Sequence, residues 1–155
     1  MKPDDSILEN PETQIEYWLS LRQIPRSQIE EQFDIDPETV IRTSYSWEAE
    51  LELLRNRTTH TGQFYFRDHT FILYTITSSS ELRKISGTQL IRALGEPTAI
   101  LPSRVGKRFK VYIYPEKGIA ISAEKDTLRL IEIFPSMSLE AYRASFYQEP
   151  PTYIR

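Results

Sequence analysis

Residues 108–134 read RFKVYIYPEKGIAISAEKDTLRLIEIF, and this stretch decides the fold. It contains three runs rich in β-branched and aromatic residues, at 108–114, 119–123 and 127–134. The runs are separated by PEKG and EKD, which are typical of tight turns. Strands joined by such short turns pair with their neighbours in antiparallel order. The stretch therefore predicts an antiparallel meander.

A second strand-rich stretch lies upstream, where residues 63–67 and 70–77 flank Asp68 and His69. These two residues are the turn candidates, so we expect a hairpin. Both faces of the run 70–77 are apolar, which is typical of a central strand that is covered on two sides. Together with the meander, the hairpin predicts a sheet of about five strands.

Helical patterns surround these strands. In the stretch 46–56, Trp47, Leu51 and Leu54 recur with the spacing of one helix face, and Ser46 is a suitable N-cap. We expect this to be the strongest helix of the chain. Further helices are expected at 13–24, at 26–33, from Asp36, at 88–94 (ended by Gly95 and Pro97) and after Ser138.

This order of elements predicts an α+β fold, in which an antiparallel meander packs against several short helices on one side. A helix followed by strands occurs at 47–77 and again at 88–134, so an internal duplication is one interpretation of the chain. We expect a single domain over residues 1–155, with a lead-in at 1–12, an acidic helical segment at 13–56, the sheet with its helices at 57–147 and a tail at 148–155.

The composition excludes several classes of site and leaves an uneven charge. The chain has no cysteine, so disulfides, thiolate metal sites and cysteine nucleophiles are ruled out. Its net charge of −3 divides into −8 over residues 1–56 and +5 over the remainder. No apolar run is long enough for a membrane span or a signal peptide, so we expect a cytoplasmic protein that does not insert into membranes.

The sequence shows no catalytic or cofactor-binding signature. The two histidines, His60 and His69, lie in predicted loops and are too few for a zinc site without cysteine. No phosphate-binding glycine loop is present, and the run Ser78–Ser80 lacks the context of a nucleophile elbow. We therefore expect no enzyme activity, no cofactor and no metal. An enzyme with an unrecognised site remains an alternative.

Two regions raise the question of nucleic-acid binding. Residues 26–43 resemble a helix-turn-helix in pattern, but their acidic charge opposes contact with phosphates. The basic residues gather instead at 83–110. An acidic protein and RNA are the two alternative partners for this region. Strand alternation at 108–114 places Lys110, Tyr112 and Tyr114 on one face of the sheet. The basic cluster comprises Arg83, Lys84, Arg92, Arg104, Lys107, Arg108 and Lys110.

Residues from about 84 to 134 resemble the small helix-then-meander domain of BamE/SmpA-like proteins and of β-lactamase-inhibitor-protein-like repeats. The resemblance implies an α+β binding or assembly module without catalysis. The chain departs from BamE in lacking a lipid-bearing cysteine. The matching features are Ile85 and Gly87 before the helix, Leu90 and Leu94 on it, Gly95 and Pro97 after it, then Tyr112, Tyr114, Gly118 and the closing LIEI.

We therefore expect a non-catalytic assembly or regulatory factor that binds a protein partner. A small nucleic-acid-binding regulator, using the 83–110 region or the 26–43 segment, is the main alternative. Exposed arginine and aromatic side chains dominate many interfaces. On this basis the predicted partner-binding residues are Arg104, Lys107, Arg108, Lys110, Tyr112 and Tyr114.

Overall fold

The computed structural model describes residues 10–32, 41–45, 48–56, 62–77 and 82–147, with the strands between 41 and 56 described by their backbone. These residues form one antiparallel sheet of eight strands in the order β1-β2-β3-β4-β8-β7-β6-β5. The predicted α+β class with an antiparallel sheet is confirmed, but the sheet is wider than expected. The strands are β1 (Ile41–Tyr45), β2 (Glu48–Asn56), β3 (Gly62–Arg67), β4 (Thr70–Thr77), β5 (Ala99–Pro102), β6 (Lys110–Tyr114), β7 (Ile119–Glu124) and β8 (Thr127–Ile133).

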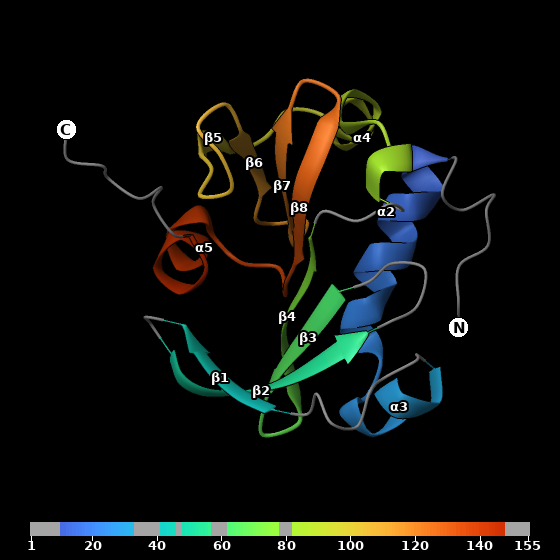
Figure 1. The fold of residues 1–155 in the computed structure, drawn as a ribbon, viewed down its shortest axis with the longest axis vertical. Coiled ribbons are helices and arrows are strands. Elements are labelled where there is room, and N and C mark those ends of the chain that lie inside the picture. Colours follow the sequence, from blue (N-terminus) through green and yellow to red (C-terminus); the bar gives the residue numbers. More distant parts are fainter. Residues whose placement is uncertain (1–9, 33–40, 46–47, 57–61, 78–81, 148–155) are drawn as a thin grey trace.

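Helices cover both faces of this sheet, whereas the sequence predicted them on one side (Figure 1). Trp18, Ile29 and Leu90 belong to one core cluster, while Tyr142 and Phe146 belong to a second cluster on the opposite face. The helix after β8 therefore packs alone, among the described helices, against the second face. The helices are α2 (Pro11–Ser20), α3 (Ile29–Gln32), α4 (Gly87–Leu94) and α5 (Leu139–Ser145), with short 3₁₀ turns η1 (Leu21–Gln23), η2 (Arg26–Gln28) and η4 (Leu82–Lys84).

The sheet consists of two four-stranded meanders that meet at the pair β4–β8. Each residue of β3 and β4 has a counterpart 57 positions later, because Gly62 corresponds to Ile119 and Thr70 to Thr127. The β4–β8 register is symmetric about the pair Thr75 and Glu132, which are themselves counterparts. A pseudo-two-fold axis therefore passes through the centre of the sheet.

The two meanders also share a β-bulge at the same place. In β3–β4 the register shifts between Tyr65 and Phe66, and Ile72 is left without a partner. In β7–β8 it shifts at the corresponding position, where Arg129 is left over. The structural repeat therefore extends to local irregularities. The sequence predicted that the first unit, at 47–77, is a helix followed by strands. The structure differs, because a strand occupies most of the expected helix at 46–56.

The prediction of a helix at 46–56 is wrong, because residues 48–56 form the strand β2. The sequence EAELEL at 48–53 alternates charged and apolar residues with a period of two, which a strand satisfies better than a helix. The acidic helical segment predicted for 13–56 therefore ends earlier. The expected helix from Asp36 begins outside the described residues, and its continuation at 41–45 is the strand β1. The last residues of the helix-turn-helix pattern, 41–43, therefore lie in a strand, while 33–40 lie outside the described residues.

Strand β5 lies at the sheet edge and is not among the strands that the sequence predicted. The Ser103 N–H donates to Phe109 O at 3.0 Å, so by antiparallel alternation the backbone of Pro102 faces away from β6. A proline, which has no N–H, fits at such an edge position. The Tyr147 hydroxyl donates to the outward Pro102 carbonyl at 2.8 Å, which covers part of the exposed edge.

The predicted turn at Asp68 and His69 and the predicted caps of the helices at 88–94 and after Ser138 are confirmed. The turn residues Asp68 and His69 both have positive φ, as a tight hairpin between right-twisted strands requires. Helix α4 is capped by Ser86 and ends at Gly95, whose φ of 88° is in the region that favours glycine. Ser138 caps α5 through a bond from Ala141 N to its hydroxyl at 3.1 Å.

Candidate functional site

The loop at 103–109, which joins β5 to β6, is held by its own hydrogen bonds. Ser103 is buried, and its hydroxyl lies 2.8 Å from the hydroxyl of Ser122 on β7. The Val105 N–H donates to the same Ser103 hydroxyl at 3.3 Å. The Phe109 N–H closes a turn on Gly106 O at 3.1 Å. These bonds give the loop a defined shape before any partner arrives.

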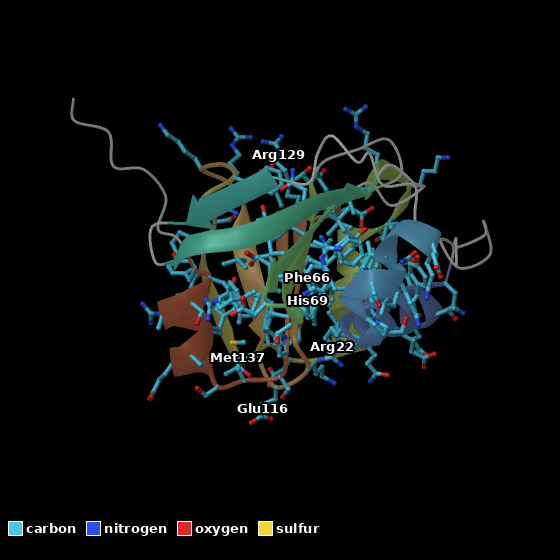
Figure 2. The ribbon with its side chains drawn as sticks, turned by 90° about the horizontal axis from the view of Figure 1, so that it is seen from below. Arg22, Phe66, His69, Glu116, Arg129 and Met137 are labelled. Carbon is cyan, nitrogen blue, oxygen red and sulfur yellow. The ribbon has the colours of Figure 1, made fainter. Side chains whose placement is uncertain are left out.

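Arg129, the bulged residue of β8 that is labelled in Figure 2, holds this loop. Its guanidinium lies 4.5 Å from the centre of the Phe109 ring, and it donates to Val105 O at 3.2 Å. A side chain at Gly106 would meet the Phe109 ring at 2.9 Å, so the loop backbone needs glycine there. A bulge often redirects a side chain, and here it brings a cation from β8 over the loop.

Exposed cations gather where this loop meets the β7–β8 turn. Lys110 pairs in register with Pro102 on one side and Ala123 on the other, so the loop and the turn lie at the same end of the sheet. The nearby acidic side chains of the described turn are Glu124 and Asp126. We call this surface the basic end, and define it by Arg104, Lys107, Arg108, Lys110, Lys125 and Arg129, all of which are exposed.

The structure separates the two predicted tyrosines from the four predicted cations. Tyr114 is 2 % exposed, and its hydroxyl donates to Gly95 O at 2.9 Å. Burial, together with the neighbouring Tyr112, raises the pKa of Tyr114 to about 12. Tyr112 is half-buried and packs against the core cluster of α2 and α4. Tyr114 therefore shares the predicted face with Tyr112 but is part of the core, where a partner cannot reach it.

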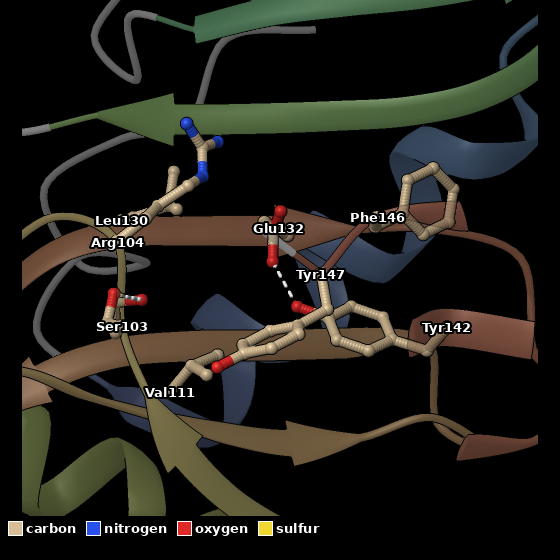
Figure 3. A pocket seen from close by; sticks show the side chains of 9 residues that line it. Ser103, Arg104, Val111, Leu130, Glu132, Tyr142, Phe146 and Tyr147 are labelled. Carbon is tan, nitrogen blue, oxygen red and sulfur yellow. Dashed lines mark hydrogen bonds between the residues drawn. The ribbon is translucent and has the colours of Figure 1, made fainter. Parts of the chain in front are cut away.

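A small polar hollow lies beside the basic end, on the face that α5 covers (Figure 3). At its base the hydroxyl of Tyr142, on α5, donates to the Glu132 carboxylate at 2.6 Å. Glu132 is 4 % exposed, and this burial raises the pKa of its carboxyl, while the Tyr142 hydrogen bond and the charge of Arg104 partly oppose the rise. The pKa of Tyr142 is raised as well, first by its own burial and then by Glu132.

The hollow offers about 10 Å³ to solvent, which is room for about one water molecule. An organic substrate would need several times this space. The hydrogen bond between Tyr142 and Glu132 joins α5 to the sheet. Arg104 has two environments, because it is exposed to solvent and still acts electrostatically on Glu132.

Sequence reasoning missed Arg129, Glu132 and Tyr142. Arg129 reaches the loop only because of the bulge, which has no signal in a single sequence. Glu132 left a signal, since it is the charged residue inside the apolar run LIEIF. A strand covered on both faces buries such a residue, and a buried carboxyl needs a donor. Tyr142 supplies that donor from the next helix.

The described residues contain no group of three or more histidine, aspartate or glutamate side chains placed as metal ligands. His69 is exposed in the β3–β4 turn, and His60 and Ser78–Ser80 lie outside the described residues. Within the same described ranges, no helix has the length and apolarity needed to cross a membrane. Comparison of the chain with models of protein families, with curated proteins and with solved structures finds no match.

Proposed function

We propose that this protein is a non-catalytic binding factor that holds an acidic protein partner at the basic end. The observation that supports this most directly is the pre-organised loop at 103–109, which displays Arg104, Lys107 and Arg108 to solvent. Ordering a loop on binding costs free energy, and a loop that is already ordered avoids this cost. The resemblance of residues 84–134 to small helix-then-meander modules implies binding without catalysis, which agrees with this proposal.

An acidic protein fits this surface better than a nucleic acid does. Sequence-tolerant binding of single strands relies on exposed aromatic rings that stack on bases. The aromatic rings that the sequence offered for this purpose, Tyr112 and Tyr114, pack against or within the core. Phe109 is 6 % exposed and lies beneath Arg129. The cations therefore have no exposed ring of this set beside them, which favours a partner recognised by charge and shape.

The proposal is tested with poly-L-glutamate as a model acidic chain and single-stranded RNA as the competing polyanion. Binding of both to the full-length protein is measured by fluorescence anisotropy over a salt series. We expect poly-L-glutamate to bind at low salt and the variant K107E/R108E/K110E to bind about tenfold more weakly or less. Arg104 is left unchanged because its charge acts on the buried Glu132.

A matched control reverses three cations that lie away from the basic end, in the variant R67E/R92E/K117E. This variant has the same net charge as the test variant, so it separates a local effect from an overall one. Equal losses in both variants, or no binding of poly-L-glutamate by the wild type, would overturn the proposal. Tighter binding of RNA than of poly-L-glutamate would identify the nucleic-acid alternative instead.

A further inference from the structure

A groove of about 400 Å³ lies between helices α2 and α4, and the β6–β7 turn closes one end of it. The two helices lie side by side on the same face of the sheet, far from α5 (Figure 1). A space of this size is in the range of known ligand-binding sites. It is separate from the basic end and is not used by the proposed function.

The floor of the groove is apolar. Ile15 on α2 and Leu94 on α4 belong to the core and are 8 % and 6 % exposed. Leu19 is half-buried at the next turn of α2, and Ala93 is exposed on α4. These four side chains form a strip that an apolar side chain of a partner can contact.

The rim of the groove is mainly acidic. Glu12 and Glu16 are exposed and lie four residues apart on α2, so they project from the same side of that helix. Glu116 is exposed on the β6–β7 turn. Among the described residues none of these three carboxylates forms an ion pair. Lys117 is the remaining exposed charge of the rim.

Arg22, the other cation at the groove, is directed toward backbone carbonyls. Its Nε donates to Leu19 O at 3.0 Å, and its Nη1 lies 3.4 Å from both Lys117 O and Phe134 O. A Cβ at Gly118 would lie 2.6 Å from that nitrogen and 2.2 Å from Phe134 O, so glycine makes room for the guanidinium. Figure 2 shows Arg22 and the nearby Glu116 at this end of the molecule. The end of the groove is thus fixed by Arg22, and the rim carboxylates remain available.

We propose that this groove, here called the acidic groove and defined by Glu12, Ile15, Glu16, Leu19, Ala93 and Glu116, docks a basic amphipathic helix of a protein partner. The apolar side of such a helix would lie on the apolar strip of the groove, where Leu19 and Ala93 are the more accessible side chains. Lysine or arginine side chains flanking that side would reach Glu12 and Glu16 on the α2 wall and Glu116 at the end that the β6–β7 turn closes. Helix-in-groove recognition uses this combination of apolar anchors and flanking charges, and the complementary charge sets the orientation.

The test uses the synthetic peptide KLAKLAKKLAKLAK as the basic amphipathic probe and ELAELAEELAELAE as its acidic counterpart. Binding to the full-length protein is followed by ¹⁵N chemical-shift mapping and isothermal titration calorimetry. We expect the basic peptide to bind and to shift the amides of α2 and α4, and the acidic peptide to leave them unchanged. The variant E12Q/E16Q/E116Q is expected to weaken binding by about tenfold or more.

Two further variants keep the result specific to the groove. The control E31Q/E124Q/E140Q removes the same charge elsewhere and is expected to bind as the wild type does. Ala93→Trp fills the groove from an exposed helix position and is expected to abolish binding without unfolding, which circular dichroism checks.

The proposal is overturned if the basic peptide does not bind or if the control variant loses as much affinity as the groove variant. It is also overturned if Ala93→Trp binds normally, or if sedimentation shows a dimer of the wild type that the Ala93→Trp variant does not form. None of these outcomes depends on the basic end, so this test and that of the proposed function can fail separately.

Discussion

Strands β1–β4 and strands β5–β8 follow the same path through the sheet, but corresponding positions carry different side chains. At the shared bulge, Ile72 in the first meander and Arg129 in the second have no partner in the strand register. Ile72 packs against the core cluster of α5, whereas Arg129 holds the loop at 103–109. The same backbone feature therefore supports packing in one meander and presents a charged loop in the other.

The centre of the sheet shows the same contrast. Thr75 and Glu132 face each other across the pseudo-two-fold axis, and both are 4 % exposed. Threonine tolerates this burial at little cost, but the glutamate needs the hydroxyl of Tyr142 on α5. The repeat thus defines the strand layout, while the different side chains at corresponding positions contribute Glu132 to the hollow and Arg129 to the basic end.

The largest expected effect compares Leu73 with its counterpart Leu130. Leu73→Ala should lower the free energy of unfolding by about 3 kcal/mol, because Leu73 is fully buried and the cavity cannot fill with solvent. Leu130→Ala should lower it by about 2 kcal/mol, because Leu130 borders the solvent-open hollow and water can enter the space. Urea unfolding followed by tryptophan fluorescence measures both values. An equal or larger loss for Leu130→Ala would show that the two meanders are packed alike.

A smaller effect on the free energy of unfolding is expected at Glu132 and Thr75, the pair at the pseudo-two-fold axis. Burial raises the pKa of Glu132, so between its ordinary pKa of 4.5 and the raised value the folded state binds more protons than the unfolded state. Stability contributed by this group therefore falls as pH rises through that window. Glu132→Gln keeps an acceptor for Tyr142 and removes the charge, so we expect a gain of roughly 1 kcal/mol at pH 7 that fades toward pH 4.5.

The control for this prediction is Thr75→Val, which changes the corresponding position without a titratable group. Its effect on the free energy of unfolding should be the same at pH 7 and at pH 4.5. Thermal unfolding of the three proteins across this range provides the measurement. A loss of stability in Glu132→Gln at pH 7 would mean that attraction to Arg104 outweighs the burial of the carboxylate.

The smallest expected effect compares the two hairpin turns. Asp126, in the β7–β8 turn, accepts hydrogen bonds from the hydroxyl of Ser86 and, at 3.2 Å, from the N–H of Thr88 at the start of α4. These bonds lower the pKa of Asp126 below its ordinary 3.8, so its contribution is present above that pH and is lost as the pH falls further.

Asp126→Ala should therefore lower Tm slightly at pH 7 and have no effect at strongly acidic pH. The counterpart His69 is exposed in the β3–β4 turn, and His69→Ala should leave Tm unchanged at neutral pH. Parallel thermal scans of both variants at the two pH values make the comparison. An equal decrease in both variants would indicate a general turn effect instead of the cap on α4.

Much of the fold follows from local sequence patterns. The runs around PEKG and EKD determine the strands β6, β7 and β8, because apolar and β-branched residues between turn residues favour a paired extended chain. Ser86, Gly95 and Ser138 determine where α4 and α5 begin or end, since capping depends on a few neighbouring residues. The exposed cations of the loop, Arg104, Lys107 and Arg108, were likewise predictable, because a charged loop between strands lies at the surface.

Only the tertiary structure decides the rest. Residues 48–56 contain both helical spacing and strand alternation, and pairing with β3 makes them a strand. The pairing of β4 with β8, the packing of α5 on the second face and the contact of Arg129 with Phe109 join segments that are far apart in the chain. A local sequence pattern determines the period of a helix or strand and where it ends. Which other element it pairs with or packs against depends on which distant surfaces bury its apolar side chains best, and this is decided only when the whole sheet has assembled.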